Sequence, residues 1–165
     1  MTEGGVLDAG LLPGIERTLV SAPGLTLGVD TRDHTWYPTR GVEMKAMGHW
    51  ARGAFGSDYD FEIFEVDLRG YRSFGSTVVL AGQLRLESLE GNPPFFMLPG
   101  LGGENGLRGY RGSLYRDETL AYGRVELRRA GLYRRLGGVL FAGIGDVAPR
   151  PDKLTLSKEL WTAGF

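Results

Sequence analysis

Alternation between apolar and polar residues is the dominant pattern along this chain. In residues 42–51, one parity holds Val42 and Met44 and the other holds Glu43 and Lys45. The same period of two recurs in further runs, at residues 24–30, 60–71, 78–87, 121–128, 138–147 and 160–165. Because successive side chains of a strand point to opposite faces, the pattern predicts about seven β-strands and no long amphipathic helix.

The run at residues 60–71 changes parity partway along. Phe61 and Ile63 share one parity, whereas Phe64, Val66 and Leu68 share the other. An extra residue inserted into one strand of a pair shifts the alternation in this way. We therefore expect a β-bulge within this strand.

The strand candidates are long for a soluble protein. Most span about ten residues, compared with about 5–6 in soluble sheets, and a membrane-crossing β-strand needs about 9–11 with alternating polarity. One parity is aliphatic or small, and the other carries the polar and charged set Glu43, Lys45, Asp67, Arg69, Gln83, Arg85, Arg124, Glu126 and Arg128. Strand length favours a membrane β-barrel, but a soluble β-sandwich also alternates, and periodicity alone leaves open which face meets water.

Composition narrows the classes of function. The 165 residues carry a net charge of -1, so no basic field attracts nucleic acid. Cysteine is absent, which excludes a disulfide framework and a thiolate metal site. The two histidines, His34 and His49, lack a metal-ligand spacing. The start of the chain lacks the basic and apolar regions of a secretory signal.

A glycine-rich insert separates the strand candidates at residues 78–87 and 121–128. It contains glycines at positions 100, 102, 103, 106, 109 and 112. Leu107, Arg108 and Tyr110 lie in its middle, where a flexible linker would carry small polar residues instead. Glycine permits tight turns and close backbone approach, so we expect a loop at about residues 88–118 that is folded against another part of the molecule.

Two segments together resemble a known family. Residues 30–41, which read DTRDHTWYPTRG, resemble the "DTRD-x-x-x-x-PTRG" hairpin of the BamA/TamA family of outer-membrane β-barrel proteins, also called the bacterial surface-antigen family. Residues 106–110, which read GLRGY, resemble that family's "(V/L)RG(F/Y)" loop. The motif residues are Asp30, Arg32, Asp33, Pro38 and Gly41 in the hairpin and Gly106, Leu107, Arg108, Gly109 and Tyr110 in the loop. The resemblance runs from about Gly24 to Phe165.

The resemblance implies an all-β fold, an antiparallel up-and-down meander within a transmembrane barrel of about sixteen strands. About seven strands cannot close such a barrel, and open edges in lipid would leave backbone groups without partners. We therefore expect residues 24–165 to form a partial outer-membrane barrel and residues 1–23 a poorly defined N-terminal segment. The rest of the barrel and any periplasmic domains would lie outside this chain.

In that family the loop folds into the barrel lumen and its arginine pairs with carboxylates of the following strands. Here Glu126 matches the first carboxylate, so the resemblance implies an ion pair between Arg108 and Glu126. The second family carboxylate would fall at Gly143, and Asp146 lies three residues further on the opposite parity. Whether Asp146 replaces the missing aspartate stays open at this stage.

The resemblance implies a barrel segment of an outer-membrane protein assembly or translocation factor, without catalytic residues, metal or cofactor. Its expected partners are outer-membrane lipid, client outer-membrane or secreted proteins, and periplasmic domains or accessory proteins. One alternative is a passive outer-membrane pore or secretion barrel, whose lumen would be lined by Arg69, Arg85, Arg124 and Arg128. A more remote alternative is a soluble β-sandwich binding domain.

Overall fold

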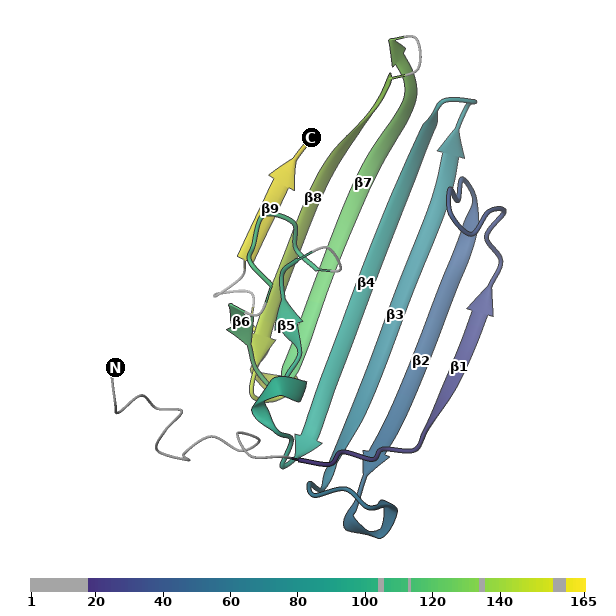
Figure 1. Ribbon diagram of the computed structural model, residues 1–165. Coiled ribbons are helices and arrows are strands. Elements are labelled where there is room, and N and C mark those ends of the chain that lie inside the picture. Colours follow the sequence, from purple (N-terminus) through teal and green to yellow (C-terminus); the bar gives the residue numbers. More distant parts are fainter. Residues whose placement is uncertain (1–17, 104–105, 113, 134–135, 156–159) are drawn as a thin grey trace, which may run out of the picture.

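A computed structural model describes residues 18–103, 106–112, 114–133, 136–155 and 160–165. Within these residues, a seven-stranded sheet has the order β1-β2-β3-β4-β7-β8-β9 (Figure 1). Its strands are β1 Gly24–Asp30, β2 Gly41–Ala51, β3 Phe61–Phe74, β4 Val78–Gly91, β7 Thr119–Tyr133, β8 Leu136–Ala148 and β9 Leu160–Gly164. Every neighbouring pair is antiparallel, so the predicted up-and-down meander is confirmed.

The remaining described elements are short. They are the 3-10 turns η1 Gly53–Phe55, η2 Phe95–Met97 and η3 Pro151–Lys153, and the two-stranded sheet of β5 Gly100–Leu101 and β6 Tyr115–Arg116. No helix among the described residues is long and apolar enough to cross a membrane.

The strand register gives the main sheet two chemically different faces. Arg69 lies opposite both Glu43 and Gln83 on what we name the polar face. Leu68 lies opposite both Met44 and Leu84 on the other side, the apolar face. Large side chains of the apolar face are exposed, including Leu84 at 61%. A β-sandwich would bury this face under a second sheet, and the described residues provide none there.

The bulge expected in the third strand is wrong. β3 pairs with β4 without interruption from Phe61 opposite Gly91 to Phe74 opposite Val78. The parity changes because the polar face itself becomes apolar at this end of the sheet, where Phe61 and Leu89 are each 1% exposed. A register shift occurs instead between β7 and β8, near Arg129 and Tyr133.

The connection between β4 and β7 occupies residues 92–118 and folds back over the sheet. Figure 1 shows β5 in front of β7 and β8, with β6 beside it. Leu101 of β5 lies so close to Gly145 that a Cβ added there would be 2.8 Å from Leu101 Cδ1. Gly145 is opposite Tyr122 on the polar face, so the loop covers that face.

Of the N-terminal segment expected at residues 1–23, positions 1–17 lie outside the described residues. The described part hydrogen-bonds to the connection that follows β2. The Leu19 backbone N–H donates to the Asp58 carboxylate at 2.6 Å, and the Asp58 N–H donates to the Leu19 carbonyl at 2.9 Å. This part of the segment is thereby attached to the sheet's end.

Candidate functional site

The connection between β1 and β2 is the segment that carries the DTRD and PTRG motifs. Asp30 accepts hydrogen bonds from Arg32 Nε at 2.9 Å and Nη2 at 2.7 Å. Asp33 accepts from the Thr39 hydroxyl at 2.5 Å, the Thr39 backbone at 2.8 Å and the Arg40 backbone at 3.1 Å. The Thr39 hydroxyl, followed by these backbone donors, holds the pKa of Asp33 well below its usual range. The two aspartates thus stabilise the conformation of this connection through hydrogen bonds within it.

Gly41 and Pro38 complete this segment. Gly41 has a φ of +102°, and a Cβ at this position would lie 2.3 Å from the Thr31 carbonyl oxygen. A residue with a side chain would be strained there, which explains the glycine at the end of PTRG. Pro38 is buried, whereas the neighbouring Trp36 is 87% exposed.

A chain of ion pairs runs from this connection onto the polar face. Arg32 Nη1 lies 3.1 Å from Glu43 Oε2, which in turn lies 3.5 Å from Arg69 Nη1. Arg69 also makes a bidentate contact with Asp67, at 3.1 and 2.9 Å, and Gln83 Nε2 donates to the same carboxylate. Glu43, Asp67 and Gln83 are each at most 6% exposed. Ion pairs and hydrogen bonds offset the free-energy cost of burying carboxylates, so these partners connect the DTRD segment to the polar face.

The glycine-rich loop has an apolar core of its own. Leu101 and Leu107 are fully buried and pack with Leu120 and Tyr122 of β7, which are 3% and 5% exposed. Tyr110 also packs against this cluster. Burial of leucine side chains stabilises the packed state by about 1.5–3 kcal/mol each, so the cluster anchors the loop to β7.

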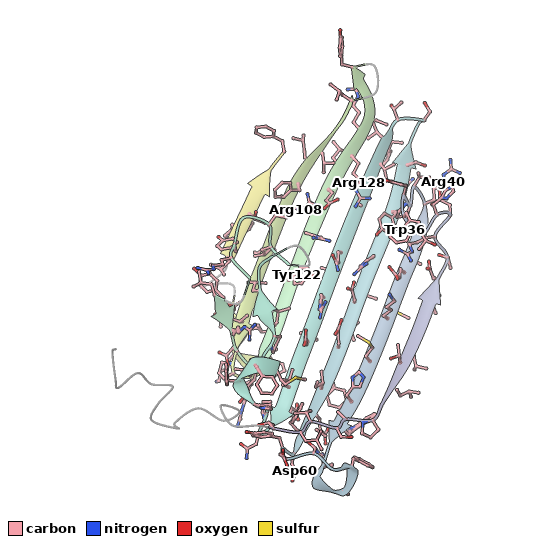
Figure 2. The ribbon with its side chains drawn as sticks, in the orientation of Figure 1. Trp36, Arg40, Asp60, Arg108, Tyr122 and Arg128 are labelled. Carbon is pink, nitrogen blue, oxygen red and sulfur yellow. The ribbon has the colours of Figure 1, made fainter. Side chains whose placement is uncertain are left out.

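The structure brings Arg108 and Glu126 together. Arg108 Nη2 lies 2.7 Å from Glu126 Oε1, while Glu126 Oε2 accepts from Arg128 at 2.7 and 2.8 Å. The Arg108 guanidinium also lies 4.9 Å from the centre of the Phe141 ring, a cation–π contact. Figure 2 shows Arg108 and Arg128 at a similar height on the sheet. One carboxylate of β7 therefore serves an arginine from the loop and another from its own strand.

Two hydrogen bonds attach the loop to β9. The Thr162 hydroxyl donates to the Arg108 carbonyl at 2.5 Å. The Tyr110 hydroxyl donates to the Trp161 carbonyl at 2.8 Å. The motif is thus held by consecutive residues of a strand that lies more than fifty positions further along the chain.

Position 143, where the resemblance implies a second carboxylate, is filled by the loop itself. A Cβ on Gly143 would lie 2.9 Å from Leu107 Cδ2 and 3.1 Å from Thr162 Cγ2. Asp146 does not replace the missing group at Arg108. Its carboxylate accepts from the backbone N–H groups of Val147 at 2.9 Å and Thr155 at 3.1 Å, at the start of the next connection.

A polar cavity of about 230 Å³ lies between the β1–β2 connection and the polar face of the sheet. The β1–β2 connection contributes Arg32, Trp36 and Pro38 to its lining, and β7 contributes Glu126 and Arg128. The partner of Arg108 therefore borders the same space as the DTRD segment. Within the described residues, no three His, Cys, Asp or Glu side chains gather to hold a metal ion.

Sequence reasoning missed Thr162 and Phe141 as contacts of the loop. A threonine in a short terminal strand gives no signal of its own. Phe141 gave none either, because its place on the polar face, opposite Glu126, follows from the strand register and not from the sequence of β8. An aromatic side chain on a polar face indicates that something apolar or cationic covers it.

Comparison with known proteins adds two findings. The Omp85 superfamily domain model matches residues 16–149. Among solved structures, the crystal structure of BamA from Haemophilus ducreyi lacking POTRA domains 1–3 is similar, with a TM-score of 0.65 and 18% sequence identity. The similarity covers 75% of this chain and 29% of that one, so the chain spans less than a third of that BamA chain. No curated protein matches the sequence.

Proposed function

The chain belongs to the Omp85 superfamily, and we propose that it is a barrel segment of an outer-membrane protein assembly or translocation factor whose LRGY loop packs inside the lumen. The observation that carries the proposal is the attachment of that loop to the polar face through Arg108 and Glu126, 2.7 Å apart. The proposed partners are outer-membrane lipid, client outer-membrane or secreted proteins, and periplasmic or accessory domains of the complete assembly.

The two faces of the sheet fit the two environments of such a barrel. Leu27, Leu84 and Leu140 of the apolar face are each at least 60% exposed, which suits contact with lipid tails. Glu43, Asp67 and Glu126 of the polar face are held by arginines, which suits a lumen lined by charged groups. A charged residue facing the bilayer centre would instead cost about 2–4 kcal/mol.

Connection lengths suggest how the segment is oriented. One end of the sheet carries the connections at residues 31–40 and 75–77, and the other carries those at 52–60 and 92–118. Outer-membrane barrels have short periplasmic turns and longer extracellular loops. In this proposal the LRGY loop enters the lumen from the cell-surface end, and the DTRD segment lies at the periplasmic end.

The mechanism involves no bond chemistry. The apolar cluster around Leu107 and the ion pair of Arg108 hold the loop against β7, so that the loop fills part of the lumen. A filled lumen prevents free passage of solutes while the barrel stays able to open laterally or pass a client strand. The contacts join the loop to three successive strands, β7, β8 and β9, so loosening it would affect all three.

The passive-pore alternative rests on the arginines of the polar face. The carboxylate partners within 3.1 Å are Asp67 for Arg69, Glu65 and Glu87 for Arg85, and Glu126 for Arg128. These pairs cancel much of the positive charge that anion selectivity requires. Steady single-channel conductance with anion preference would favour the pore over the assembly role.

Substituting Arg108→Ala in the complete membrane protein tests the proposal. We expect the loop to become accessible to protease and assembly activity to fall, because the substitution removes a charge-assisted hydrogen bond that contributes about 1.5–3 kcal/mol. Heat-modifiable mobility on gels should persist, since the sheet itself is unaltered.

The matched control is Arg111→Ala. Arg111 is an exposed arginine of the same loop and makes no ion pair with any residue that the structure describes. The Arg111→Ala substitution should leave the protection of the loop from protease and the assembly activity unchanged. Unchanged loop protection in Arg108→Ala would contradict the proposed role of the loop.

A further inference from the structure

We propose that Thr162 is a positioning residue for the LRGY loop: its hydroxyl holds the main chain at Arg108, so that a single carboxylate suffices to keep the guanidinium in place. The inference deepens the proposed function and rests on it, because it assigns the anchor of the same loop. β9 thereby joins β7 and β8 as a third strand that anchors the loop.

The contact geometry supports this role. Thr162 Oγ1 donates to the Arg108 carbonyl oxygen at 2.5 Å, and the Tyr110 hydroxyl donates to the Trp161 carbonyl at 2.8 Å. The loop is therefore held on both sides of Gly109 by neighbouring residues of one strand. The first bond holds the main chain at Arg108 itself and the second holds the Tyr110 side chain, so together they restrict the positions open to the Arg108 side chain.

The charges around Arg108 explain why a main-chain anchor is needed. Glu126 is the one carboxylate among the described residues in ion-pair contact with Arg108, and it also binds Arg128 at 2.7 Å. Two guanidinium groups thus share one carboxylate, each bound to a different oxygen. The Phe141 ring offers a cation–π contact at 4.9 Å, which is weaker and less directional than a second carboxylate. The Thr162 hydrogen bond holds the main chain, which the ring cannot do.

The packing around Gly143 connects Thr162 to the loop in a second way. Gly143 of β8 lies directly opposite Thr162 of β9. A Cβ on Gly143 would lie 2.9 Å from Leu107 Cδ2 and 3.1 Å from Thr162 Cγ2. It would also lie 3.2 Å from the Gly123 carbonyl oxygen, which cannot move aside as a flexible side chain can. Thr162 and Leu107 therefore share the space that a side chain at position 143 would need, and the present loop position requires glycine there.

The test compares Thr162→Val with Thr162→Ser in the complete membrane protein. Valine keeps the volume and loses the donor, whereas serine keeps the donor. We expect protease to cleave the loop roughly fivefold to tenfold faster in Thr162→Val, as the loss of one hydrogen bond predicts, and at the parent rate in Thr162→Ser. Heat-modifiable gel mobility should be unchanged in both.

Gly143→Ala gives an independent test should Thr162→Val fail to fold. Its matched control is Gly82→Ala, because a Cβ on Gly82 has no neighbour closer than 4.0 Å. We expect protease to cleave the loop faster than in the parent protein in Gly143→Ala, and at the parent rate in Gly82→Ala. Equal rates in these two variants would overturn the inference.

The outcomes separate this inference from the proposed function. If Arg108→Ala speeds cleavage and Thr162→Val does not, Thr162 has no positioning role while the loop proposal stands. If neither variant speeds cleavage, both are contradicted. If Thr162→Ser is cleaved as fast as Thr162→Val, the hydroxyl is not the anchor and the inference fails.

Discussion

A single buried carboxylate organises the charged residues around the loop. Glu126 is 4% exposed and binds Arg108 with one oxygen and Arg128 with the other. Removing one partner of a buried pair leaves an uncompensated charge, but here the second arginine remains. The loop can therefore separate from Glu126 without leaving that carboxylate alone.

At the other motif, Asp33 gives a prediction on pH. Its carboxylate accepts three hydrogen bonds from Thr39 and Arg40, and the Thr39 hydroxyl lowers its pKa most strongly. A lowered folded-state pKa means that the stabilisation is fully present above the usual aspartate value of about 3.9 and is lost as the pH falls through the lower, folded-state pKa. We expect a carboxyl NMR titration of Asp33 to show a midpoint below that usual value. A midpoint at or above it would contradict the hydrogen-bond geometry.

The element scale shows what alternation can and cannot predict. It located the long strands because each has one face in a polar and one in an apolar environment. It led to the wrong expectation of a bulge after Phe61 and Ile63, because the polar face becomes apolar at that end of the sheet. It also gave no sign of β5 and β6, because two-residue strands are too short to show a period.

The apolar face yields a depth-dependent prediction. Leu84 lies midway along β4 and is 61% exposed, whereas Phe74 ends β3 and is 50% exposed. If this face contacts lipid, Leu84→Arg should destabilise the folded barrel by about 2–4 kcal/mol and Phe74→Arg by about 0–1 kcal/mol, because the cost falls near the interfaces. Denaturant unfolding in lipid vesicles measures both values. Equal costs at the two positions would argue against a bilayer around the sheet.

At the scale of the whole molecule, the alternation of residues and the family resemblance predicted different features of the structure. Periodicity predicted about seven strands but not which face meets lipid, whereas the antiparallel meander, which is confirmed, was implied by the resemblance. The pairing of Arg108 with Glu126 was implied by the resemblance of the GLRGY and DTRD segments, because spacing alone cannot bring a loop residue to a particular strand. Thr162 lay beyond both approaches, since its role depends on where the loop's main chain passes β9.

The most direct measurement of the central claim is the accessibility of the loop's buried side chain. The chain contains no cysteine, so Leu107→Cys introduces the one thiol in this segment. Leu107 is fully buried, whereas Leu114 of the same loop is 64% exposed and provides the matched control as Leu114→Cys. In intact membranes, a small water-soluble maleimide should label Leu114→Cys and should leave Leu107→Cys unlabelled until the sample is heated. Equal labelling of both cysteines before heating would contradict a loop packed against the inner face of the barrel.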